Sequence, residues 1–325
     1  MRFLLASILL LAAMPLAASE LTVEIPFDQS SVSLEDAGPY TMVSVRGLPS
    51  YHGEGLPALP IMPVRVALPT GCRAQGMEVV DARYTSLRGS YEVMPSAAPV
   101  PFSVEQRIVP VEPDPQIYER DATFPTRRAE FRSSGPFMGI PVATAVVYPV
   151  RWNAAEGGLE VLSSMTVRVS YEYDADMMSV SRRTAESESR ARSIVENMVV
   201  NPQGVSASGA AIVAPRELAY GEYVIVTHPD YETQAQELAD WKTAKGVPAN
   251  VYTTTWVDGE YSTADLQQDI RAFFHDCIDE GAEFALIFGD DDKIAGRDVI
   301  VENSYYTEYP PVDLYWADLN DTGPG

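Results

Sequence analysis

An alternation of strand and helix patterns in the C-terminal third of the chain constrains its fold more than any other feature. Three short apolar runs are typical of buried strands, at residues 223–227, 247–252 and 284–288. The helix-like stretches between them end at Gly246 and Gly281, because glycine commonly follows the last turn of a helix. Strand, helix, strand, helix and strand in this order predict parallel pairing with right-handed crossovers. We therefore predict that residues 219–325 form the first part of a flavodoxin-like parallel α/β domain.

The region from residue 20 to residue 176 has a different, all-β pattern. Val167, Val169 and Tyr171 alternate with polar residues, as in a half-buried strand. Further short strands are predicted at residues 21–25, 40–45, 63–68 and 145–152. A turn-rich segment at 153–158 predicts a hairpin between the last of these and the strand that contains Val167. Short strands bounded by Pro, Gly and Ser favour an antiparallel β-sandwich. The fold class is thus α/β plus all-β.

Residues 177–218 are predicted to be a linker between the two regions. The segment is polar and rich in Arg, Ser and Glu, with a short helix expected over residues 185–198. Proteolytic nicking concentrates in exposed, weakly structured linkers. We therefore regard Arg183, Arg192 and Arg216 as candidate processing sites, and a passive spacer is the alternative.

The N-terminus has the pattern of a secretory signal peptide. Arg2 precedes an unbroken apolar run, and small residues around Ser19 suit cleavage at that point, so we assign residues 1–19 to the signal. No later segment reaches the roughly 20 apolar residues of a membrane-spanning helix. We expect a secreted or extracellular protein without a transmembrane segment, or one retained at the cell surface.

Composition and motifs exclude several functions. A net charge of −23 and a pI near 4.4 argue against nucleic acid as a partner, because its phosphates require Lys and Arg. The sequence contains no phosphate-binding glycine loop, no dinucleotide fingerprint, no zinc-binding H-E-x-x-H and no G-x-S-x-G. We expect no required cofactor.

The two cysteines are not expected to act as nucleophiles. His275 is two residues from Cys277, a spacing that points helical side chains in different directions. Cys277 falls on the apolar face of a predicted helix, and we interpret it as a small buried hydrophobic residue. Cys72 lies in the other predicted region, and export would permit a disulfide.

Other polar residues suggest ligand sites. His228 follows the first predicted strand, at the edge where open α/β sheets bind ligands, although an ordinary loop residue is the simpler interpretation. The run 290–292 of three aspartates suits either a hard cation or a solvated, capped turn. Asp318 and Asn320 resemble the first ligands of an EF-hand-type loop, with Gly323 at the turn. A structural Ca²⁺ is expected there, with a plain acidic turn as the alternative.

Several blocks resemble the gingipain-type cysteine peptidases of family C25. The blocks similar to the catalytic domain are residues 223–227, 240–246, 284–290 and 313–318. The blocks similar to the family's propeptide are residues 53–60, 64–71, 135–141 and 147–150. Their order and spacing, across most of the chain after the signal, make the resemblance fairly specific.

The resemblance implies a secreted zymogen in which a β-sandwich prodomain precedes a caspase-like α/β domain. The family's catalytic pair is Cys and His, with the His as base for the thiol. None of the family's catalytic motifs has a match before Gly325, so no catalytic residue is assigned and this stretch alone is expected to be inactive. The implied partners are protein or peptide substrates and the protein's own prodomain, as an intramolecular inhibitor or chaperone.

Two other functions remain open from the sequence. A non-catalytic C25-like surface or secretion-associated protein would keep the scaffold without the thiol. A β-sandwich adhesin with an attached α/β binding module would show further sandwich repeats and no processing of the linker.

Overall fold

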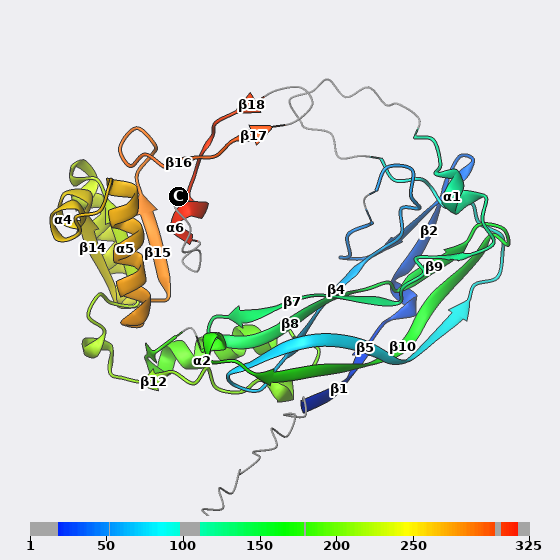
Figure 1. Cartoon of the computed structure of the whole chain (residues 1–325), viewed down its shortest axis with the longest axis horizontal. Coiled ribbons are helices and arrows are strands. Elements are labelled where there is room, and N and C mark those ends of the chain that lie inside the picture. The colour runs from blue at the N-terminus through cyan, green and yellow to red at the C-terminus, as the bar shows by residue number, and fades with distance from the viewer. Residues whose placement is uncertain (1–18, 52, 98–110, 179, 303–306, 318–325) are drawn as a thin grey trace, which may run out of the picture. The chain divides into compact units, whose positions relative to one another are not determined.

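The computed structural model describes residues 19–51, 53–97, 111–178, 180–302 and 307–317 (Figure 1). The chain divides into two compact units. The first contains Met1–Pro63, Ala74–Arg132 and Ala145–Glu172, and the second contains Val64–Arg73, Ser133–Thr144 and Tyr173–Gly325. The predicted boundaries at residues 176 and 218 stay predictions. No helix in the described ranges is both long enough and apolar enough to cross a membrane.

A five-stranded sheet forms most of the first unit. Its order is β1 (Ser19–Pro26), β10 (Gly158–Tyr173), β9 (Val150–Asn153) and β6 (Thr123–Phe124), and β5 (Cys72–Ser86) also pairs with β10. β1 and β10 are antiparallel, as are β10 and β9, which confirms the predicted hairpin. Trp152 in β9 is fully buried and its indole N–H donates to the Tyr91 carbonyl at 2.8 Å. The core of this unit forms around that indole.

Two smaller groups of strands complete the β-rich part. β2 (Val32–Ala37) and β3 (Tyr40–Val45) form an antiparallel hairpin. β4 (Met62–Ala67), β8 (Ile140–Val147) and β7 (Ala129–Phe137) form a sheet in that order, and α1 (Pro115–Tyr118) is a single turn. The prediction of one strand over 145–152 was wrong. Pro149 has no N–H to donate, and the chain leaves β8 there and enters another sheet as β9.

The predicted linker is folded. α2 (Ala185–Glu196) begins at Thr184, whose hydroxyl accepts the Ser187 N–H at 3.1 Å, and this confirms the predicted helix. β11 (Arg182–Arg183) pairs in parallel with β12 (Ala211–Ile212). The apolar side of α2 is buried in one cluster that contains Ala67, Ile140, Val142, Ala191, Val195, Val199 and Val205. The expectation of a weakly structured segment was therefore wrong.

The α/β part contains a parallel sheet in the order β14 (Ala249–Thr253), β13 (Tyr223–Thr227) and β15 (Phe284–Phe288). Successive residues of a strand face opposite sides of its sheet. Val224 and Val226 accordingly pack with α5 (Leu266–Asp279), whereas Ile225 packs with α3 (Glu232–Ala244). Helices thus cover both faces, and the predicted parallel pairing is confirmed.

Details of the helices differ from the expectation. α4 (Thr254–Glu260) was not predicted, and Thr253 caps it by accepting the Trp256 N–H at 3.2 Å. Asp265 caps α5, and its carboxylate accepts the Gln268 N–H at 3.0 Å. α3 buries two small residues, Ala235 and Ala239, and leaves Trp241 54% exposed.

Short elements make up the rest. The remaining strands are β16 (Arg297–Asp298), β17 (Val301–Glu302), β18 (Thr307–Glu308) and β19 (Pro311–Val312). The 3₁₀ turns are η1 (Gln29–Ser31), η2 (Ala175–Met177), η3 (Pro202–Gly204), η4 (Pro215–Glu217) and η5 (Pro229–Tyr231). In α6 (Leu314–Ala317), Trp316 is buried, and its indole N–H donates to the Gln267 carbonyl at 3.0 Å.

Candidate functional site

The carboxyl end of the parallel sheet is where ligands bind in open α/β folds. β13 and β15 end side by side there, and the Thr227 hydroxyl donates to the Phe288 carbonyl at 2.9 Å. His228 follows β13 directly, and its Nδ1 accepts the backbone N–H of Asp230 at 3.2 Å. His228 therefore lies at the predicted edge, where it caps the turn η5. Its Nδ1 is also 3.3 Å from Asp230 Oδ2, an ion pair only if the ring is protonated.

Lys293 connects the two loops at this edge. Its ammonium group lies 2.9 Å from Asp230 Oδ2, so the loop after β15 is joined to the loop after β13. The hydrogen bond from Lys293 lowers the pKa of Asp230, and the same contact raises the pKa of Lys293. The edge thus presents a lysine and an aspartate that are both charged at neutral pH, beside an imidazole.

The aspartate run after β15 forms a capped turn. The Asp290 carboxylate accepts the N–H of Asp291 at 2.8 Å, and the Asp291 carboxylate accepts the N–H of Gly296 at 2.9 Å. Both side chains therefore bind their own loop. Within the described residues, no group of three or more His, Cys, Asp or Glu side chains is placed to hold a metal ion. Asp318 and Asn320 lie outside the described residues, and calcium at those positions stays a prediction.

The two cysteines are free thiols. Cys277 is buried and His275 is exposed, so the two side chains point in different directions, as expected. Burial raises the pKa of the Cys277 thiol, and it also raises the pKa of the Cys72 thiol. A nucleophilic cysteine needs a lowered pKa and access to solvent. Cys277 instead lines an apolar cavity of about 440 Å³ beside β15.

The candidate processing residues have three different environments. The Arg183 side chain is 1% exposed. Arg192 is half-exposed in the middle of α2 and pairs with Glu196 at 3.6 Å. Arg216 is exposed in η4, and its neighbours on both sides are exposed as well. Only Arg216 of the three lies in an accessible stretch outside an α-helix. Ser19, the predicted signal cleavage position, is the exposed first residue of β1.

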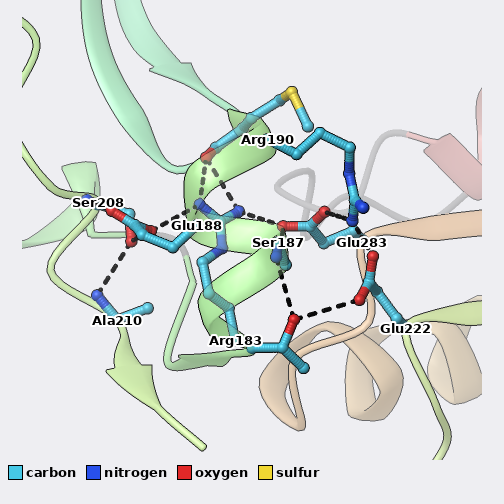
Figure 2. Close-up of polar contacts among 10 residues, drawn as sticks. Arg183, Ser187, Glu188, Arg190, Ser208, Ala210, Glu222 and Glu283 are labelled. Carbon is cyan, nitrogen blue, oxygen red and sulfur yellow. Dashed lines mark hydrogen bonds and ion pairs between the residues drawn. The ribbon is translucent and has the colours of Figure 1, made fainter. Parts of the chain in front are cut away.

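A buried ion network lies at the amino end of the parallel sheet (Figure 2). The Arg183 guanidinium is 3.1 Å from Glu188 and 2.6 Å from Glu283. Arg190 of α2 pairs with Glu222 and lies 3.1 Å from Glu283. Glu222 and Glu283 come directly before β13 and β15 and are 1% and 5% exposed. Sequence reasoning missed this network, although a glutamate directly before each of two predicted strands was the available signal.

The chain matches two related families along its length. Residues 21–196, more than half of the chain, match the family described as Propeptide_C25. Residues 216–323 match the family described as Peptidase family C25.

Individual relatives come from Porphyromonas gingivalis. Lys-gingipain HG66 is 22% identical over 269 residues, which cover 80% of this chain and 15% of that protein. The chain therefore spans about 15% of the length of this curated relative. The complex of RgpB pro- and mature domains has a TM-score of 0.44 at 18% identity, covering 59% of this chain and 96% of that one. A structure on the zymogenic latency of gingipain K has a TM-score of 0.37 at 16% identity. The match covers 47% of this chain and 100% of that chain.

Proposed function

This chain belongs to the gingipain-like C25 peptidase family, with the propeptide and the start of the catalytic domain, and we propose that it is the N-terminal portion of a secreted cysteine endopeptidase zymogen. The observation that carries the proposal is the order of the two family matches. A propeptide match at 21–196 precedes a peptidase match at 216–323, and a connection of fewer than 20 residues separates them. This is the arrangement of a precursor whose inhibitor or chaperone is part of the same chain.

We assign the chemistry to the carboxyl edge of the parallel sheet. A Cys–His pair there would use the imidazole as base for the thiol in attack on a peptide carbonyl. Cys277 does not fit this role, because it is buried within the sheet core and its pKa is raised. The catalytic thiol and imidazole are therefore expected in the part of the catalytic domain that follows residue 325. The full domain is proposed to have a caspase-like fold, and the propeptide that of a β-sandwich.

Processing is proposed to occur between the two family matches. The connection runs from residue 197 to residue 215, and no residue is buried in the stretch 211–217, which reaches the start of the peptidase match. Arg216 is the candidate favoured by exposure, since peptidases need an accessible backbone. The substrates are proteins or peptides, and the propeptide is an intramolecular partner. The signal-like N-terminus supports export of the protein.

The test uses the protein expressed from its complete reading frame. The secreted, processed protein is expected to hydrolyse casein, and iodoacetamide is expected to abolish that activity. Substitution of Cys277 by Ala is expected to leave the activity in place, because the assigned thiol lies elsewhere. Full retention of function after alkylation, or Ser, Gly or Asn at the nucleophile position, would instead support a non-catalytic relative.

A further inference from the structure

Arg183 joins three segments that are far apart in the sequence. Both of its terminal nitrogens donate to the Met138 carbonyl, each at 3.1 Å. One nitrogen also contacts Glu188 in α2, and the other contacts Glu283 at the start of β15. A planar guanidinium suits this task, because its fixed fork of donors can serve several acceptors at once. The junction connects propeptide residues with a residue of the peptidase match.

The Met138 carbonyl is presented by a strained turn. Met138 and Gly139 form the two-residue loop between β7 and β8, with φ angles of 49° and 74°. Positive φ is uncommon for a residue with a side chain, and such strain persists only where the surroundings stabilise it. Two-residue hairpin turns favour positive φ at both positions, so the hairpin itself supports this geometry, and the two hydrogen bonds from Arg183 add to that support. The turn and the arginine are therefore adapted to one another.

The remaining acceptors of the network are also satisfied. The Thr184 hydroxyl donates to Glu222 at 3.4 Å, and the Ser187 hydroxyl donates to Glu283. The N–H and the hydroxyl of Ser208 donate to Glu188 at 2.9 and 2.7 Å. Three carboxylates thus face two guanidinium groups, and neutral donors compensate the extra negative charge. The carboxylates of the network are thus satisfied, whereas the Nε atoms of Arg183 and Arg190 are buried without a hydrogen-bond partner.

The two sides of α2 have different partners. Ala191 and Val195 pack with Ile140 and Val142, which belong to the propeptide match. Arg190, on the polar side, contacts Glu222 and Glu283 of the peptidase match. The helix is therefore held to its own propeptide by apolar contacts and to the α/β sheet by charged ones.

A close backbone approach supports the same contact. Gly281 follows α5 with a φ of +96°, and a Cβ at this position would lie 2.7 Å from the Arg182 carbonyl oxygen. Gly246 occupies the equivalent place after α3, and a Cβ there would meet nothing within 4 Å. The backbone of the linker therefore occupies space at Gly281 that only glycine leaves open. Arg182 also pairs with Glu280 at 2.7 Å.

We propose that residues 180–196, here named the propeptide arm, keep the propeptide docked on the amino end of the α/β sheet after the connection has been cut, with Arg183 as the central anchor. The docking surface consists of Glu222, Glu283 and the Gly281 turn. It lies at the opposite end of the strands from the edge assigned to catalysis, so the arm does not itself block that edge. Arg183 is thereby an anchor and not a processing site. The statement that the connection is cut in the mature protein rests on the proposed function.

The experiment introduces a single cut without using the protein's own activity. A recognition sequence for a site-specific viral protease is inserted between Ala214 and Pro215, in the exposed stretch of the full secreted chain. The chain is nicked with that protease, and the N-terminal piece is immobilised through a tag. The retention of the C-terminal piece is then measured over time. The unsubstituted nicked protein is expected to retain it.

Arg183→Met is expected to increase the dissociation rate by on the order of 100-fold, because it removes the cation that Glu188 and Glu283 share, so that Glu188 loses this partner and the buried Glu283 keeps only Arg190. Arg183→Lys keeps the positive charge but loses the planar set of guanidinium donors. An intermediate increase in the dissociation rate is expected. The matched control is Arg192→Met in α2 of the same arm, which removes an exposed pair and is expected to change the rate less than about twofold. Near-ultraviolet circular dichroism before nicking shows whether each variant is folded.

Glu283→Gln provides a second route if Arg183→Met does not fold, and it is expected to increase the dissociation rate by at least tenfold. Prompt separation of the unsubstituted nicked pieces would overturn the proposal. Retention of the Arg183→Met or Glu283→Gln pieces at the unsubstituted rate would overturn it as well. Because an added protease makes the cut, an inactive full-length protein would contradict the proposed peptidase but not the anchor.

Discussion

Glu283 donates its backbone N–H to the carbonyl oxygen of Glu222 at 2.9 Å, so these two glutamates lie side by side at the amino end of the parallel sheet. Their side chains are almost completely buried, and each directly precedes a strand of that sheet. Two neighbouring carboxylates in such a place repel each other unless a cation compensates them. Arg190 contacts both of them. The base of the sheet therefore depends on a helix that belongs to the propeptide match.

Replacing Arg190 by Met tests this dependence. The change removes the cation shared by the two glutamates, and we expect a loss of about 2 kcal/mol in the free energy of unfolding, below the value for a fully buried pair because Arg190 is partly exposed. Urea denaturation measures it. Arg192→Met is the control, with an expected loss below about 0.5 kcal/mol. Equal losses in the two variants would contradict a special role for Arg190.

Two glycines offer a matched pair of substitutions. Gly246→Ala forces an alanine into a positive φ and is expected to cost about 1 kcal/mol. Gly281→Ala carries the same backbone cost and also a clash with the Arg182 carbonyl and the Leu218 side chain, so we expect about 3 kcal/mol in total. Urea denaturation of both variants measures the difference. A Gly281 variant as stable as the Gly246 variant would mean that the linker does not approach this turn.

Acid is expected to weaken the network through Glu188. Burial alone would raise its pKa, but hydrogen bonds from Ser208 and the nearby Arg183 outweigh burial and hold the pKa below its usual value. A carboxyl with a lowered pKa in the folded state contributes stability above its unfolded pKa, and the contribution disappears as the pH falls through the folded pKa. Glu188→Gln should therefore destabilise the protein at pH 7 and have a smaller effect near pH 3. A constant difference between pH 7 and pH 3 would contradict this account.

Cys277 is expected to be chemically inert in the folded chain. Burial raises the pKa of its thiol, so little thiolate forms at neutral pH. Iodoacetamide at pH 7 should label Cys277 only after unfolding in urea, and mass spectrometry of the peptide that contains it measures this. Rapid labelling of the native chain would show that the thiol is accessible. It would contradict the argument that Cys277 has no catalytic role.

The α/β order could be predicted from the sequence because each element carries its own local pattern. Val224, Ile225 and Val226 are continuous apolar residues in a strand that helices cover on both faces. Gly246 and Gly281 end their helices with positive φ, as expected. Local patterns of this kind do not depend on distant parts of the chain.

The parts that were missed depend on contacts between distant residues. The break between β8 and β9 at Pro149 reflects a change of sheet, which spacing within one run does not reveal. Arg183 looked like an exposed linker residue, yet Met138, Glu188 and Glu283 enclose it from three separate segments. On α3 the small Ala235 and Ala239 pack closely on the sheet, and the large Trp241 is left exposed.

The most direct test of the zymogen account follows processing and activity together in the secreted protein from its complete reading frame. Intact mass and N-terminal sequencing identify the cut, and casein hydrolysis with and without iodoacetamide measures thiol-dependent activity. The account predicts a new N-terminus between residues 197 and 217, with activity that appears as this cut is made. Full activity in the uncut precursor, or no thiol-dependent activity after the cut, would contradict it.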